Sequence, residues 1–179
     1  VLKLDTEKPV ILAVTSSKAA GTYKSGTIDL KVDFSEPVSS TADLVLTLEL
    51  SAAGTDADGN ALAAVEETVT IASSALSTAV SHVSVSYTVQ AGDLSQGLSV
   101  SSITGTLSDA AGNEMTSPVS TGYTNLSQNN AGLSYTGKVL KLDTEKPSIL
   151  AVTSSTAEGV YTLGQPAINL TVTFSEPVT

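Results

Sequence analysis

The chain contains the same nine-residue segment twice. The sequence VLKLDTEKP occupies Val1–Pro9 and returns unchanged at Val139–Pro147. Two further identities follow both copies in the same order, ILAVTSS at Ile11–Ser17 and Ile149–Ser155, and FSEPV at Phe34–Val38 and Phe174–Val178. A period near 138 residues is far longer than a solenoid unit and matches an ordinary domain. We therefore interpret residues 1–138 as one complete repeat and residues 139–179 as the first two strands of the next repeat in a tandem array.

The absence of cysteine limits how such a domain is stabilised. A chain of 179 residues with no cysteine has no disulfide, no zinc–thiolate site and no cysteine nucleophile. Its length is sufficient to bury a stabilising apolar core. No run approaches the roughly 18 apolar residues of a transmembrane helix, so we expect no membrane span.

The charge balance is strongly acidic. Eight basic residues, all of them lysine, face eighteen acidic residues, and the formal charge is -10. Nucleic-acid binding depends on clustered Lys and Arg, so we expect no nucleic-acid partner. An acidic surface suits a soluble protein, or cations held between carboxylates.

Several short segments alternate between apolar and polar residues. The alternation is clearest in Thr27–Phe34, Leu44–Leu50 and Val83–Val89. A period of two predicts half-buried strands. Pro37 has no N–H to donate to a sheet, so we expect it to end the strand that begins at Thr27.

The remaining strands are predicted from composition and from turns. We expect strands at Val10–Ser16, Val65–Ser73 and about residues 98–107, with turns rich in Gly, Asp and Asn at 54–60 and 109–113.

The last strand has two candidates, Met115–Tyr123 and Leu133–Leu142. No segment shows the spacing of an amphipathic helix. About seven short strands with regular turns predict an all-β protein, and we expect a seven-stranded immunoglobulin-like Greek-key β-sandwich.

A series of short motifs resembles a known family. In chain order these are DTEKP at 5–9, GTY at 21–23, FSEPV at 34–38, YTV at 87–89 with AGD at 91–93, and DAAGN at 109–113. This succession resembles the immunoglobulin-like and cadherin-like repeats of large bacterial surface proteins and adhesins, over essentially the whole of 1–138. The resemblance implies an extracellular stalk at the bacterial cell surface, often calcium-dependent at its junctions.

Acidic residues are concentrated in segments that a sandwich brings together at its two poles. One predicted set is Asp5, Glu7, Glu36, Asp109 and Asn113; at the opposite pole Asp56, Asp58 and Asn60 are expected to face Asp143, Glu145 and Glu176 of the next repeat. Calcium takes six to eight oxygen ligands, commonly carboxylate, amide and backbone oxygens. A cation also removes a repulsion on the order of 1–4 kcal/mol per carboxylate pair. We therefore predict bound Ca2+ at both poles; the alternative is that these residues serve only as turn formers and a solvated surface.

The sequence does not predict an enzyme. His82, the single histidine, lies on the polar face of a predicted strand, without a placed nucleophile or an orienting acid. We expect a structural extender whose partners are the neighbouring repeats of the same chain. Two alternatives remain: a module that binds a glycan or a host protein, and an extracellular filament in which strands of 139–179 add to the sheet of an identical chain.

Overall fold

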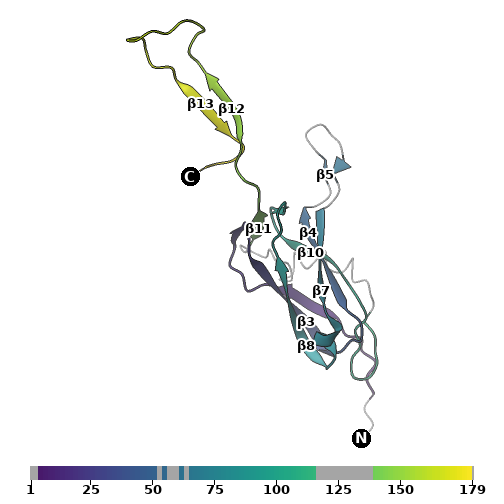
Figure 1. Cartoon of the computed structure of the whole chain (residues 1–179). Coiled ribbons are helices and arrows are strands. Elements are labelled where there is room, and N and C mark those ends of the chain that lie inside the picture. Colours follow the sequence, from purple (N-terminus) through teal and green to yellow (C-terminus); the bar gives the residue numbers. More distant parts are fainter. Residues whose placement is uncertain (1–3, 52–53, 56–60, 63–64, 116–138, 179) are drawn as a thin grey trace. The chain divides into compact units, whose positions relative to one another are not determined.

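The chain forms two compact units built from β-strands. The computed structural model describes residues 4–51, 54–55, 61–62, 65–115 and 139–178. The first unit is Val1–Thr144 and the second is Glu145–Thr179. Apart from one 3-10 turn, every regular element in the described residues is a strand, and most strands pair antiparallel, so the predicted all-β class is confirmed (Figure 1). No described segment forms a helix that is long and apolar enough to span a membrane.

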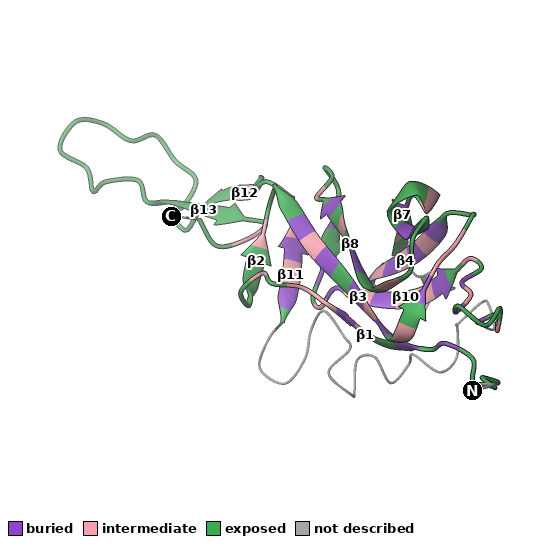
Figure 2. Cartoon of the chain, turned by 90° about the horizontal axis from the view of Figure 1, so that it is seen from below, coloured by how far each residue is buried: buried purple, intermediate pink, exposed green. Residues whose placement is uncertain are grey.

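One sheet of the first unit contains β1 (Ile11–Thr15), β3 (Thr27–Val38) and β8 (Val80–Thr88), with β3 in the centre. Both pairings are antiparallel. The apolar residues of the alternating stretch, Ile28 to Phe34, are all buried, while Asp29, Lys31 and Asp33 face outward. Figure 2 shows the resulting bands of buried and less buried residues along β3.

A second sheet has the order β10 (Ser99–Thr104), β4 (Leu44–Ser51) and β7 (Val65–Ile71). Its four alternating leucines, from Leu44 to Leu50, are buried in the same hydrophobic core as the inward face of β3. The short strands β5 (Gly54–Thr55) and β6 (Ala61–Leu62) pair with each other after β4.

A third, small sheet closes one end of the first unit. In it β11 (Leu140–Asp143) lies between β2 (Gly21–Tyr23) and β9 (Leu94–Ser95), parallel to β2 and antiparallel to β9. We call this end the β11 pole. The opposite end, where Asp5 precedes β1 and β3 ends, is the Asp5 pole (Figure 1).

Two predicted strand ends are wrong. The strand that begins at Thr27 does not end before Pro37 but continues to Val38. Its pairing with β8 is interrupted between Asp33 and Val38, so Pro37 lies where no ladder donor is required. The strand predicted to reach Ser73 ends at Ile71, because the chain then turns into a 3-10 helix, Ser73–Leu76, that buries Leu76.

The last strand of the first unit is β11, which overlaps the second of its two predicted candidates. Residues 116–138 lie outside the described part of the chain, so most of both candidate segments is not described. The sequence repeat places a boundary after residue 138, whereas the contacts group residues up to Thr144 with the first unit. The reason is that Leu140 and Leu142 are buried in the core of that unit.

The second unit contains one described hairpin, β12 (Ile149–Ser154) paired antiparallel with β13 (Leu170–Phe174). The pairing joins Ile149 with Phe174 and Val152 with Val172, with an irregularity between Ile149 and Ala151. In the first unit β1 and β3 join Ile11 with Phe34 and Val14 with Val32, with an irregularity at the same place. The repeated sequence therefore forms the same hairpin twice.

Candidate functional site: an acidic cluster at the Asp5 pole

Three carboxylates come together at the Asp5 pole. Asp5, Glu36 and Asp109 each have a carboxylate oxygen within 4.8 Å of those of the other two. Asp5 is exposed, Glu36 is half-buried and Asp109 is buried. These three residues belong to the set that the sequence predicted to converge, although more than 70 positions separate Glu36 from Asp109.

Backbone pairing explains why Glu36 meets Asp109. At the end of β3, the N–H groups of Ser39 and Ser108 each donate to the carbonyl of the other residue, at 2.9 and 3.0 Å. This bridge holds the last residues of β3 beside the turn that contains Asp109. Met115 closes this turn, because its N–H donates to the Leu107 carbonyl at 2.8 Å.

The Asp109 carboxylate organises its own turn. Its Oδ1 accepts the backbone N–H groups of Ala111 and Asn113, at 2.9 and 2.7 Å. Gly112 has a φ of 89°, a left-handed conformation that glycine adopts without strain. The bond from the Asn113 side chain, together with those from the backbone, lowers the pKa of Asp109, so this residue is a carboxylate at neutral pH.

Asn113 connects the carboxylates through its side-chain amide. Its Nδ2 group donates to Asp109 Oδ2 at 2.7 Å and to the Asp5 backbone carbonyl at 3.2 Å. A positive N–H end thus faces the acceptors that a cation would use. Rotating the amide by about 180° presents its oxygen instead, which gives the cluster a neutral ligand of the kind calcium accepts.

The environment of Glu36 disfavours its charged form. Desolvation raises the pKa of this carboxyl, and the charges of Asp109, Asp5 and Glu7 raise it further. Glu7, which the sequence predicts as a ligand, is not one of the three clustered carboxylates, but its charge acts on Glu36 and its N–H donates to Asp5 Oδ1 at 3.2 Å.

The pKa of Glu36 predicts how stability depends on pH without divalent cations. A carboxyl with a raised folded-state pKa binds protons more tightly in the folded chain, so its contribution to stability falls as pH rises from its ordinary pKa of 4.5 through the folded value. We expect Glu36→Gln to melt above the wild type at pH 7 in chelator, and the difference to disappear near pH 4. Thermal unfolding followed by circular dichroism measures both.

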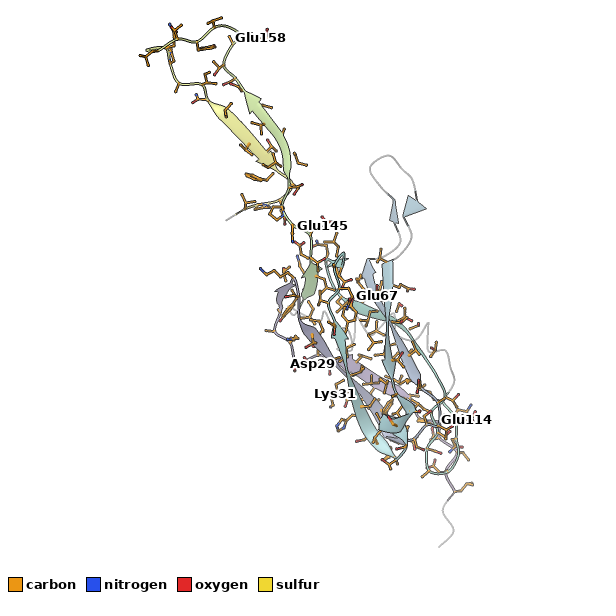
Figure 3. The ribbon with its side chains drawn as sticks, in the orientation of Figure 1. Asp29, Lys31, Glu67, Glu114, Glu145 and Glu158 are labelled. Atoms are coloured by element: carbon orange, nitrogen blue, oxygen red, sulfur yellow. The ribbon has the colours of Figure 1, made fainter. Side chains whose placement is uncertain are left out.

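A matched variant controls for the loss of one negative charge. The control is Glu67→Gln. Glu67 lies on β7, toward the other end of the unit from Glu114, which follows Asn113 at the Asp5 pole (Figure 3). If Glu67→Gln raised the melting temperature as much as Glu36→Gln, the local origin of the effect would be disproved.

The other predicted ligands do not form a described cluster. Asp56, Asp58 and Asn60 lie outside the described residues, so their placement stays a prediction. Asp143 ends β11 in the first unit, whereas Glu145 and Glu176 belong to the second unit. Glu176 corresponds to Glu36 in the repeated FSEPV motif, and its Oε1 is buried without a hydrogen-bond partner.

The β11 pole contains a buried polar network that the sequence analysis did not identify. Asp93 is 4% exposed, and its carboxylate accepts the Tyr87 hydroxyl and, at 2.7 Å, the Gln90 N–H. The Asp93 carbonyl accepts both the N–H and the hydroxyl of Thr144, at 3.2 and 3.1 Å. Burial, followed by the bond to Asp93, raises the pKa of Tyr87, so its hydroxyl stays a donor at neutral pH. This network fixes the residue that follows β11.

A surface depression of about 470 Å³ lies at the β11 pole, between the end of β4 and the segment around β9. Among the described residues, Leu50, Leu94 and the residues from Ser95 to Gly97 contribute to its lining.

Comparison of the chain with family models, with curated proteins and with solved structures finds no match in any of the three.

Proposed function

We propose that this chain is part of an array of immunoglobulin-like β-sandwich repeats that acts as an extender of a bacterial surface or secreted protein, stiffened by calcium between repeats. The observation that carries the proposal is the duplicated hairpin. The repeated hairpin supports a spacer role for the chain, because a series of units of the same kind would extend along the polypeptide.

The correspondence between the two hairpins extends to individual hydrogen bonds. Ser35 and Ser175 each donate a backbone N–H to the residue that precedes the first strand of their hairpin, at 2.9 Å in both cases. Tyr23 and Tyr161 each donate their hydroxyl to the alanine carbonyl four positions earlier, at 2.8 and 2.6 Å. Such agreement supports a second sandwich of the same design.

The strand arrangement of the first unit supports the immunoglobulin-like assignment. Its two principal sheets, β1-β3-β8 and β10-β4-β7, contribute to one core, and β11 adds a late strand beside β2. A sandwich of about seven strands from two facing sheets is the pattern expected of this class.

The connection between consecutive units is short. Five residues, Thr144–Ser148, separate β11 from β12, and the same positions before β1 are occupied by Thr6–Val10. A short connection reduces the relative freedom of two domains, because fewer backbone torsions separate them. Lys146-Pro147, like Lys8-Pro9, adds a proline that restricts the backbone further.

A cation at the Asp5 pole would stiffen this connection further. Asp5 corresponds to Asp143, the last residue of β11, whereas Glu36 and Asp109 belong to the body of the unit that follows. An ion bound by all three therefore joins the end of one unit's last strand to the next unit. Calcium is the cation that suits three carboxylates supplemented by amide and backbone oxygens.

Calcium is expected to raise the melting temperature of the first unit. At a concentration one hundred times the dissociation constant, binding stabilises the folded state by about 2.7 kcal/mol. For a domain of this size that corresponds to a rise of roughly 5–15 °C, measured by calorimetry in calcium and in chelator.

Three variants test whether the effect belongs to the cluster. Glu36→Gln and Asp109→Asn are expected to lose most of the calcium-induced rise, while Glu67→Gln retains it. If calcium left the melting temperature of the wild type unchanged, calcium binding would be disproved, but the proposal of a repeat array would not be affected.

The extender role is tested by the dimensions of two units in succession. In a polypeptide that carries residues 5–142 followed directly by residues 5–144, which reproduces the natural junction, small-angle X-ray scattering should give a maximum dimension near the sum of two unit lengths. Calcium should narrow the distribution of the longest interatomic distances, because a stiffer connection allows fewer arrangements of the two units. Two units folded against each other side by side, with a dimension near that of one unit, would contradict a spacer.

A further inference from the structure

The outer edge of β8 has no partner strand in the described part of the chain. β8 is the last strand of its sheet, with β3 along one edge only (Figure 1). Because the Val89 N–H donates to the Gly26 carbonyl at 2.9 Å, the antiparallel pattern directs the N–H and C=O groups of odd-numbered β8 residues toward β3. The even-numbered residues direct theirs outward. His82, Ser84 and Ser86 therefore each present a backbone donor and a backbone acceptor at this edge.

The other edge strands of the two principal sheets carry features that hinder pairing with another chain. β1 and β10 are short, and each has an irregularity in its pairing. β7 carries Glu66 and Glu67. β8 differs, because it has nine residues, pairs with β3 without a bulge from His82 to Thr88, and contains no proline or charged residue other than histidine. Short strands, bulges and charges protect free edges from association, and β8 lacks this protection.

The edge of β8 is also open and uncharged. A surface depression of about 350 Å³, with Glu67 on its β7 side, borders β8 from Val85 to Thr88. Residues 68–92, which include all of β8, form the longest stretch of the sequence without Asp, Glu, Lys or Arg. In a chain with a formal charge of -10, an uncharged edge is where a second copy meets the least repulsion.

We propose that β8 pairs antiparallel with β8 of a second copy of this chain, across a two-fold axis at Ser84. In this register Ser84 pairs with its own copy and His82 pairs with Ser86 of the other molecule, so the outward backbone groups of all three residues are satisfied. Val83 and Val85, on the inward face of the strand, become neighbours across the interface. The two three-stranded sheets thereby become one continuous sheet.

The charges on the sheet do not oppose this pairing. β3 carries Asp29, Lys31 and Asp33 on its outward face, with Lys31 Nζ 2.6 Å from Asp33 Oδ1. In the continuous sheet the two copies of β3 are three strand spacings apart, about 14 Å, which exceeds the screening length of about 8 Å at physiological ionic strength.

The interface rests neither on calcium nor on the spacer role. In an array every unit would offer the same edge, so two chains side by side would be joined by several such contacts at once.

The first test is sedimentation of the full chain in chelator at rising concentration, where the wild type is expected to shift from monomer toward dimer. Ser84→Glu puts two carboxylates across the two-fold axis and should weaken association by about tenfold or more, because like charges directly opposite on adjacent strands repel. Ser84 is exposed and lies opposite Lys31 within the sheet, so the monomer accommodates this change.

The matched control is Ser25→Glu, which adds the same charge at an exposed position between β2 and β3 and should associate as the wild type does. The proposal is overturned by a wild type that stays monomeric at millimolar concentration, by a Ser84→Glu chain that associates as strongly as the wild type, or by an equal loss in the control.

A second measurement uses the wild type alone, so it does not depend on the fold of a variant. The amides of His82, Ser84 and Ser86 point away from β3 and should exchange with solvent rapidly in dilute protein. Hydrogen exchange followed by NMR should show them protected several-fold more at millimolar than at micromolar concentration, while β1, at the opposite edge of the sheet, is unchanged. No added protection at these three amides, or equal protection along β1, contradicts the interface.

A disulfide tests the position of the two-fold axis. Directly opposite residues of a hydrogen-bonded antiparallel pair have Cα atoms about 5.5 Å apart, within the range that a disulfide spans. Ser84→Cys should therefore form a covalent dimer on mild oxidation, and the protein has no cysteine of its own to compete. Ser25→Cys, which is far from the axis, reports random collision. A yield at Ser84 several-fold above that at Ser25 is expected, and equal yields would disprove this register.

Discussion

Replacing Leu142 by alanine is expected to lower the free energy of unfolding of the first unit by about 2–5 kcal/mol. The side chain is 1% exposed in the core beside Tyr23, so its removal leaves a cavity and loses buried apolar area. Leu4 has the same three residues before it and the same five after it, yet is 88% exposed. Leu4→Ala should therefore change the stability by less than about 0.5 kcal/mol.

Urea unfolding of the two variants, followed by circular dichroism, measures the difference. The two substitutions share residue type and local sequence, so they alter the helix and strand propensities of the chain equally. What remains is the difference in burial. Equal losses in both variants would show that β11 does not close the first unit in solution.

The two leucines also show what a repeat reveals about a fold. Identity between Val1–Pro9 and Val139–Pro147 establishes the period, but a periodic sequence has no marked starting point. A division before Val139 and one after Thr144 are equally periodic. The position of the division is decided by tertiary contacts, here the burial of Leu140 and Leu142 against the first unit, and no local pattern reports these contacts.

Alternation predicted the strands of the first unit well because each of its two principal sheets has one buried face. The convergence of carboxylates at the Asp5 pole was predictable for a different reason. The number of strands between two loops determines the pole at which each loop lies. The prediction that Pro37 ends its strand was wrong because it assumes that every residue of the strand donates a hydrogen bond to a neighbouring strand. In this strand the pairing is interrupted where Pro37 occurs.

The network around Asp93 was not predictable from spacing alone. The segment from Ala91 to Asp93 has the composition of an ordinary turn, and Tyr87 fits the apolar face of β8. A signal was nevertheless present, because a buried tyrosine requires a partner for its hydroxyl and an acid follows six positions later.

The second large effect is expected for Asp93→Ala. The substitution leaves the buried Tyr87 hydroxyl without its acceptor, at about 1–3 kcal/mol, and removes the acceptor of the Gln90 N–H as well. The turn that presents the Asp93 carbonyl to Thr144 loses its support at the same time. We expect the free energy of unfolding to fall by about 2–5 kcal/mol and hydrogen exchange to accelerate at Thr144 and along β11.

Tyr87→Phe is the matched comparison, because it removes the hydroxyl while keeping the ring in the core. Asp93 then retains the bond from Gln90 and the carbonyl bonds to Thr144, so the loss should be smaller, about 1.5–3 kcal/mol for one hydrogen bond to a charged group. Exchange at Thr144 should change little in this variant. If Tyr87→Phe accelerated exchange along β11 as much as Asp93→Ala, the support of the closing strand would come from the packing of Tyr87 and not from the carboxylate of Asp93.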